Sequence, residues 1–143
     1  RVEPHSSPMN NIGVYGEVNT RAALIASWPG TIKPGTQCDD LVELADFLPT
    51  FLDVASAPKP MQRVHGQSFL PQLVDGKGPS KEWVHIEYKG DRQIRTKQWI
   101  YTDKGKLIQV NELGQPENRP EKSKDHADVR KEMKRILGLI DGE

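Results

Sequence analysis

The chain has 143 residues, the size of one ordinary domain, and its 20 Lys and Arg residues equal its 20 Asp and Glu residues in number. Because these charges balance and are mixed along the chain, no net field attracts a nucleic acid, and we expect no nucleic-acid partner. No apolar run approaches the roughly 20 residues needed to cross a bilayer, so we also expect no membrane span.

The N-terminal stretch, residues 1–14, contains two prolines and few apolar residues. We expect it to be poorly ordered unless another part of the protein packs on it. The chain starts at Arg1 without the pattern of a signal peptide, so we interpret it as a piece of a longer protein.

A short apolar run, residues 22–28, follows and ends at Pro29 and Gly30. Its continuous apolarity favours a strand that is buried on both faces, although a buried helical turn would give the same short pattern. A strand buried on both faces needs neighbouring strands. This run therefore indicates a sheet that extends beyond these residues.

Two short helices are predicted after a loop at residues 31–37. Asp46 is placed to cap the first helix, with Pro49 in its first turn, where a missing N–H does no harm. We expect this helix to be buried, because apolar residues recur at helical spacing: Leu48, Phe51, Leu52 and Ala55. Ser68 is the predicted cap of the second helix, which closes at Gly76.

Beyond Pro79 the apolar residues recur with a period of two. Val84, Ile86 and Tyr88 fall on one side of a predicted strand, and His85 and Glu87 fall on the other.

We predict a second strand over residues 92–101 and a third over residues 106–110. Residues 102–105 join them at the length of a hairpin turn, with Gly105 supplying a positive φ. Together the strands form an antiparallel meander.

A C-terminal helix is predicted to cover one face of the meander. We expect Ser123 or Asp125 to cap it. Its apolar face consists of Val129, Met133, Ile136, Leu137 and Ile140.

Five stretches of the sequence resemble, in consistent order and spacing, the C-terminal part of type I, formylglycine-dependent sulfatases of the alkaline-phosphatase superfamily. The first contains the turn Trp28-Pro29-Gly30, and the fourth reads Arg-Gln-Ile-Arg-Thr-Lys-Gln-Trp-Ile-Tyr, like the strand that ends in a Tyr-Lys-Tyr-Ile motif in that family. The stretches are residues 24–36, 44–55, 65–73, 92–101 and 106–118.

The resemblance implies an α+β fold with two parts after the N-terminal stretch. Residues 15–79 would be the end of the α/β sulfatase core, with one buried strand and two short helices. Residues 80–143 would be the C-terminal subdomain, a small antiparallel meander packed against a C-terminal helix.

The family hydrolyses sulfate esters with a formylglycine nucleophile and a divalent cation, usually Ca²⁺, held by Asp and Asn side chains. The resemblance implies that nearly all of these groups lie upstream, since the chain has no Asp before Asp39. Cys38 lacks the Cys-x-Pro-x-Arg signal of the nucleophile, so we interpret it as a small buried thiol. We therefore expect no catalytic residue, metal ligand or cofactor in this piece, with Ca²⁺ and formylglycine in the parent enzyme.

A family lysine is expected shortly before the apolar run, but none is present. Aligning on Arg21 puts Ile12 at that position, and aligning on Tyr15 puts Asn11 there. Either the parent site is degenerate, or the first dozen residues do not follow the course of the family.

Three residues are candidates for substrate binding: Arg21, His85 and Glu87. Arg21 matches the family arginine beside the active-site segment, where a structural ion pair is the alternative. His85 and Glu87 share a strand face that borders the substrate cleft in the family, and an exposed face of an edge strand is the alternative. We interpret His5, His65 and His126 as solvated, because none has partners at metal-ligand spacing.

The sequence favours a fragment of a sulfatase that supplies scaffold and one wall of the cleft. The alternatives are a fragment of a phosphonate monoester or phosphodiester hydrolase of the same superfamily, and a free-standing, non-catalytic interaction domain. The expected partners are the missing N-terminal core and, in the parent, a sulfated small molecule or glycan, with a homo-oligomer through exposed core surface as a further option. The family resemblance implies a periplasmic or extracellular location.

Overall fold

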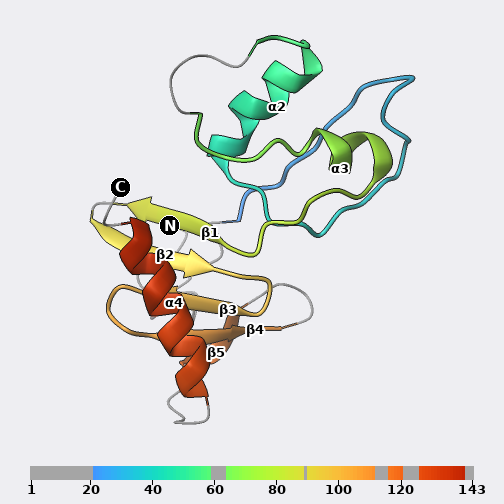
Figure 1. The fold of residues 1–143 in the computed structure, drawn as a ribbon. Helices are drawn as coiled ribbons and strands as arrows, with labels where there is room; N and C mark the ends of the chain where they lie inside the picture. Colours follow the sequence, from blue (N-terminus) through green and yellow to red (C-terminus); the bar gives the residue numbers. More distant parts are fainter. Residues whose placement is uncertain (1–20, 59–63, 89, 112–115, 121–125, 141–143) are drawn as a thin grey trace, which may run out of the picture. The chain divides into compact units, whose positions relative to one another are not determined.

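The computed structural model describes residues 21–58, 64–88, 90–111, 116–120 and 126–140 (Figure 1). The expectations for residues 1–14, including Asn11 and Ile12, and for capping by Ser123 or Asp125 lie outside the described residues.

The chain divides into two compact units. The α2 unit is Leu24–Val84, and the sheet unit combines Arg1–Ala23 with His85–Glu143. Each is described by itself.

The α2 unit contains a 3₁₀ turn, η2 (Leu44–Asp46), and two helices, α2 (Phe47–Val54) and α3 (Leu70–Asp75). The strand expected over residues 22–28 is not formed, and all seven residues are exposed coil that ends in the turn at Pro29 and Gly30. This prediction was wrong because a strand needs a pairing partner for its N–H and C=O groups, and the described sheet pairs only β1 to β5 with one another.

Helix α2 forms where it was expected, with Asp46 at the N-cap position and Pro49 in the first turn. The expectation that it is buried was wrong. Leu48 is 54% exposed and Phe51 is 62% exposed, whereas the buried residue of the helix is polar, Thr50. The apolar spacing was detected correctly, but no other described element covers that side of the helix.

Helix α3 also forms close to its expected position. The predicted cap was wrong: the N-cap residue is Phe69, and Ser68 Oγ, one residue earlier, accepts a hydrogen bond from the Leu70 N–H at 3.4 Å. The helix ends at Asp75 and is followed by Gly76, whose φ of 71° is left-handed. Glycine suits this C-terminal position because it has no Cβ to clash there.

The described strands of the sheet unit form one five-stranded sheet in the order β1-β2-β3-β4-β5. The pairs from β2 to β5 are antiparallel, which confirms the meander. The strands are β1 (Val84–Tyr88), β2 (Asp91–Arg95), β3 (Trp99–Thr102), β4 (Leu107–Val110) and β5 (Pro116–Pro120).

The single strand expected over residues 92–101 is instead a hairpin of β2 and β3. Thr96 makes the turn: its N–H donates to Trp99 O at 2.8 Å, and its Oγ1 accepts from the Trp99 N–H at 2.9 Å and the Gln98 N–H at 3.2 Å. A threonine hydroxyl that satisfies the backbone of a turn leaves no signal in the alternation of apolar residues.

The next turn was predicted correctly, with Gly105 at a φ of 76° between β3 and β4. Strand β5 was missed because Pro116 and Pro120 at its ends are typical of a loop. Proline is tolerated there, since β5 is the last strand in the sheet order and Pro lacks only the N–H.

Helix α4 (Ala127–Ile140) packs against β2 and β3, as expected, and lies across the sheet in Figure 1. Met133, Ile136 and Leu137 are buried on it. His126 was expected to be solvated, but it is half-buried, with its ring 4.6 Å from that of Trp99. The buried apolar residues of the strands are Val84, Ile94, Ile100, Tyr101, Leu107, Ile108 and Val110.

The overall class is α+β, in agreement with the expectation. Cys38 is exposed, which corrects its interpretation as a buried thiol. Among the described helices, none combines the length and apolar character that crossing a membrane requires.

The core of the sheet unit is tested by Leu107→Ala, because Leu107 is completely buried. We expect the free energy of unfolding to fall by about 2–5 kcal/mol, since the change removes buried methyl groups and leaves a cavity. Leu139→Ala on the outer side of α4 is the matched control, with an expected change within about 0.5 kcal/mol. Urea unfolding followed by circular dichroism measures both, and equal effects would contradict this description of the core.

Candidate functional site

Strand β1 carries two of the three candidate residues, His85 and Glu87. They are two positions apart, so their side chains leave the strand on the same side. His85 is half-buried, and Glu87 is exposed. The structure therefore keeps these two residues together, as the alternation in the sequence predicts.

His85 has an unusual polar atom. Its Nε2 is buried and has no hydrogen-bond partner among the described residues. Most buried side-chain nitrogens in proteins are hydrogen-bonded, and leaving one unpaired costs about 1–3 kcal/mol. His85 therefore has a buried hydrogen-bonding group that no described residue uses.

Arg21 lies in the exposed coil of residues 21–28. It already has an interaction partner in the chain, which fits the structural alternative for this residue.

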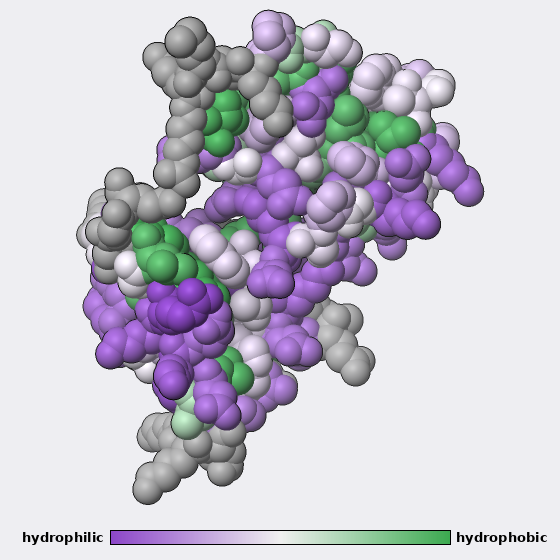
Figure 2. Space-filling model, in the orientation of Figure 1, coloured by the Kyte–Doolittle hydropathy of each residue, from purple (hydrophilic) through white to green (hydrophobic). Residues whose placement is uncertain are grey.

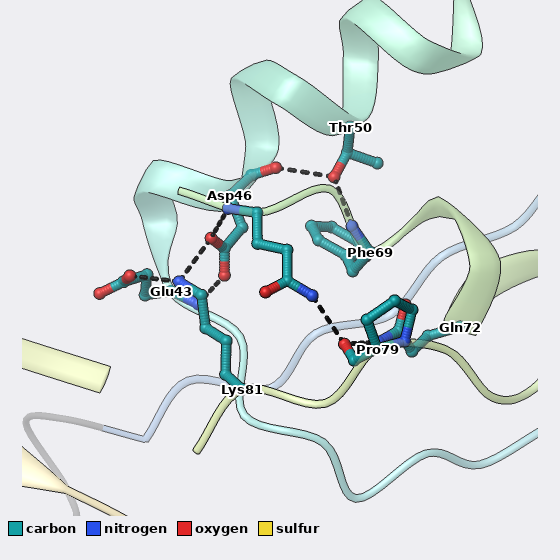
Figure 3. Close-up of polar contacts among 8 residues, drawn as sticks. Glu43, Asp46, Thr50, Phe69, Gln72, Pro79 and Lys81 are labelled. Atoms are coloured by element: carbon teal, nitrogen blue, oxygen red, sulfur yellow. Dashed lines mark hydrogen bonds and ion pairs between the residues drawn. The ribbon is translucent and has the colours of Figure 1, made fainter. Parts of the chain in front are cut away.

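The most extensive polar network that the structure describes centres on the carboxylate of Asp46 (Figure 3). Asp46 is 1% exposed. Its Oδ2 accepts a hydrogen bond from the Glu43 N–H at 2.9 Å, and its Oδ1 accepts one from the Gln67 N–H at 2.7 Å. The side chain thus holds residue 67 against the start of α2 instead of capping the helix itself.

Lys81 completes this network. Its Nζ lies 2.6 Å from Asp46 Oδ1 and also bonds to Glu43 Oε1. The Lys81 side chain is 14% exposed, so the pair is largely removed from water. A buried carboxylate needs such a counter-charge, because an unpaired charge in the interior is very costly.

A second contact fixes α2 from its inner side. Thr50 Oγ1 donates to Asp46 O at 2.7 Å and accepts from the Phe69 N–H at 3.0 Å. The Phe47 and Phe69 rings meet edge to face, with centroids 5.4 Å apart. Gly66 sits between these segments, where a Cβ would lie 2.3 Å from Ala45 O, so only glycine fits.

The loop after α3 is held by Asp40 and Pro79. Ser80 Oγ donates to Asp40 Oδ1 at 2.6 Å, and Gln72 Nε2 donates to Pro79 O at 2.8 Å. Gln67 Nε2 donates to the same carbonyl at 2.8 Å. No sequence pattern indicates Lys81, Gln67 or Gln72, because their partners are distant in the sequence and follow no local motif.

The described groups with shifted pKa values are exposed. A hydrogen bond to Asp91 raises the pKa of Lys104, and one from Arg135 lowers the pKa of Glu132. The same hydrogen bond raises the pKa of Arg135. Exposed pairs of this kind add little to stability.

A calcium site does not fit the described residues. Among them, no group of three or more His, Cys, Asp or Glu side chains is placed to hold a metal ion. The buried carboxylate, Asp46, is already occupied by Lys81 and two backbone N–H groups.

Comparison with known families defines the class of protein. Residues 13–137 match the family model described as N-sulphoglucosamine sulphohydrolase, C-terminal, which is the C-terminal region of a sulfatase. The chain belongs to this family. The resemblance to sulfatases predicted from the sequence is thereby confirmed.

Curated relatives are also sulfatases by name. The chain is 30% identical over 106 residues to an ulvan-active sulfatase of Formosa agariphila, a match that covers 67% of this chain and 21% of the relative. It is 33% identical over 98 residues to arylsulfatase K of Gallus gallus and 32% identical over 98 residues to that of Homo sapiens, and each match covers 59% of this chain and 18% of the relative. The chain thus spans about a fifth of the length of these relatives.

Removing the Asp46 carboxylate tests the network. We expect Asp46→Ala to lower the free energy of unfolding by about 3–5 kcal/mol, because Lys81 and two backbone N–H groups lose a buried acceptor. The matched control is Asp53→Ala at an exposed position of α2, with an expected change within about 0.5 kcal/mol. Urea unfolding measures both, and a neutral Asp46→Ala would show that the network is dispensable.

Proposed function

We propose that this chain is the C-terminal part of a sulfuric ester hydrolase, in which it supplies scaffold and one wall of the substrate cleft without being catalytic alone. The observation that carries the proposal is the family match over residues 13–137. The relatives named above support the reaction class, and their greater length supports the view that the catalytic groups lie elsewhere in the parent. No observation favours a phosphonate monoester hydrolase, a phosphodiester hydrolase or a free-standing interaction domain.

The parent enzyme would bind Ca²⁺ and carry formylglycine through upstream residues. Sulfate-ester hydrolysis requires fixed positive charge around a sulfate group whose negative charge shifts to the leaving oxygen, and a metal ion supplies such charge. Among its described residues, this chain contains no group of three or more His, Cys, Asp or Glu side chains that could hold the ion. The proposed role of the chain is to form one wall of the cleft and to contact the organic portion of the substrate. That substrate is a sulfated small molecule or glycan. The resemblance to exported sulfatases supports a periplasmic or extracellular location.

His85 and Glu87 are the residues proposed to form that wall, and the buried, unpaired Nε2 of His85 supports the proposal. A sugar or aryl substrate offers hydroxyl and ester oxygens that can pair with this nitrogen once the half-buried ring turns outward. Arg21 is proposed as a third contributor, with its interaction within the chain as the competing structural role.

The proposal that this chain is not catalytic alone is tested by comparing the purified 143-residue chain with the full-length polypeptide that contains it. We expect sulfate release from 4-nitrophenyl sulfate or a sulfated oligosaccharide only from the full-length protein, because the metal ligands and nucleophile lie upstream. Sulfate released by the 143-residue chain alone would contradict the proposal. A correctly folded full-length protein, with formylglycine verified by mass spectrometry, that cleaves none of a panel of sulfate esters would also contradict it.

The role of His85 is tested by His85→Ala in the full-length protein. We expect kcat/KM to fall about two- to ten-fold, the effect of losing one hydrogen bond of about 0.5–1.5 kcal/mol, with an unchanged melting temperature. His65→Ala, at an exposed histidine of the α2 unit, is the matched control and should leave both quantities unchanged. A lower melting temperature with unchanged kinetics would show that His85 is structural.

A further inference from the structure

Helix α4 carries its positive and negative charges on different sides. Every charged pair that is four residues apart within the helix has the same sign. The pairs are Asp128 with Glu132, Arg130 with Lys134, and Lys131 with Arg135. Residues at this spacing are neighbours on the helix surface, so like charges repel there, whereas a helix face adapted only to water places opposite charges at these positions. The sequence of α4 therefore accepts an electrostatic cost that solubility does not require.

The four basic residues of the helix form one face, here named the α4 basic face: Arg130, Lys131, Lys134 and Arg135. By the helical period they lie on the side of α4 away from its buried apolar residues, and the two acidic residues lie along one edge of the face. Lys131, Lys134 and Arg135 are exposed, and Arg130 is half-buried. Figure 2 shows hydrophilic side chains, in purple, over the middle of α4.

The charges at the centre of this face are available to a ligand. Lys131 and Lys134 have no ion-pair partner among the described residues. Arg135 pairs with Glu132 at 2.6 Å, but both side chains are more than half exposed. A surface pair of this kind is weak, because water competes with it, and an anionic ligand can replace the Glu132 carboxylate.

The α4 basic face continues onto the turn between β3 and β4. Arg130 Nη1 donates to Gly105 O at 3.0 Å, which places this turn beside the helix. Lys106 follows Gly105 directly and is exposed, whereas the other lysine of the turn, Lys104, is already paired with Asp91. A local excess of positive charge thus spans two elements of the sheet unit, in a chain whose total charges balance.

A linear polyanion matches this arrangement of charges. The basic residues stand in two rows, each with its members one helical turn of about 5.4 Å apart, so a ligand with negative groups repeated along its length can contact several of them at once. Such binding releases counterions and gains affinity with each added contact. Short Lys- and Arg-rich segments of this kind are typical of surfaces that bind nucleic acid or heparin.

We propose that the α4 basic face binds a sulfated glycan chain through several of its sulfate groups at once. The inference rests on the proposed function, which favours a sulfated glycan over a nucleic acid, and it narrows the substrate class to a polymer. Holding the polymer on the enzyme raises the effective concentration of its sulfate esters near the cleft.

Heparin binding by the full-length protein tests this surface. The variant Lys131→Gln/Lys134→Gln removes two charges and keeps good helix formers. Its matched control is Lys33→Gln/Lys77→Gln, which removes two charges from exposed lysines of the α2 unit. In titration calorimetry with a heparin oligosaccharide, we expect the Kd of the α4 variant to rise at least about fivefold and that of the control less than about twofold. The slope of log Kd against log salt concentration should fall by about one for each lysine removed from α4.

The remaining outcomes would overturn the proposal. Equal weakening by the two double variants would assign binding to total charge, and an unmodified protein that does not bind heparin would exclude a glycan surface. A DNA duplex of matched charge that binds as tightly as heparin would show that the face does not select a glycan. Circular dichroism checks the fold of both variants. If the α4 double variant does not fold, Lys134→Gln alone replaces it, with an expected rise in Kd of about two- to fivefold.

Hydrolysis assays separate this inference from the proposed function. The small ester 4-nitrophenyl sulfate has one sulfate group, so we expect its kcat/KM to be equal in the α4 variant and the unmodified protein, whereas kcat/KM for a sulfated polysaccharide falls in the variant. Failure of the unmodified protein to hydrolyse any sulfate ester would contradict the proposed function. Unchanged heparin binding by the α4 variant, in a protein that does hydrolyse sulfate esters, would contradict the glycan surface alone.

Discussion

The arrangement of the α2 unit depends on one buried carboxylate, that of Asp46. A charge with 1% exposure must be matched by hydrogen bonds and a counter-ion. The chain meets this requirement by bringing Glu43, Gln67 and Lys81 to the same two oxygens. Because these residues come from three separate segments, satisfying one side chain fixes the start of α2, the turn at Gly66 and the segment that leads into β1. The unit has few buried apolar contacts that would do this instead.

The two units are therefore stabilised in different ways. The sheet unit has an ordinary apolar core, with Ile94, Leu107 and Ile108 almost fully buried in the strands and α4 packed on β2 and β3. The α2 unit relies on directional polar contacts and leaves Leu48 and Phe51 at the surface. Apolar burial tolerates small changes of geometry, whereas a charged network requires its partners at hydrogen-bonding distance. The α2 unit consequently has a defined shape although it buries little apolar surface.

The features that were predicted correctly follow from short-range patterns. Three such features are each encoded within a few residues. They are the helical period of α4, the turn at Gly105, and the alternation that keeps His85 and Glu87 on one side of β1. The features that were missed depend on distant or side-chain partners. The Thr96 turn is made by a hydroxyl group, and the partner of Asp46 at Gln67 lies 21 residues away. Of the candidate site, the strand position of His85 was predictable, but its unpaired Nε2 depends on packing and was not.

Two wrong predictions share one physical cause. Residues 22–28 were expected to form a buried strand and α2 a buried helix, and both are exposed in this chain. In each case the sequence pattern is typical of an element covered on both sides, such as one in an inner layer of a larger protein. The pattern indicates apolar surroundings, and the described residues do not provide them. Apolar surfaces that lack neighbours among the described residues agree with membership of a family defined by the C-terminal part of a sulphohydrolase.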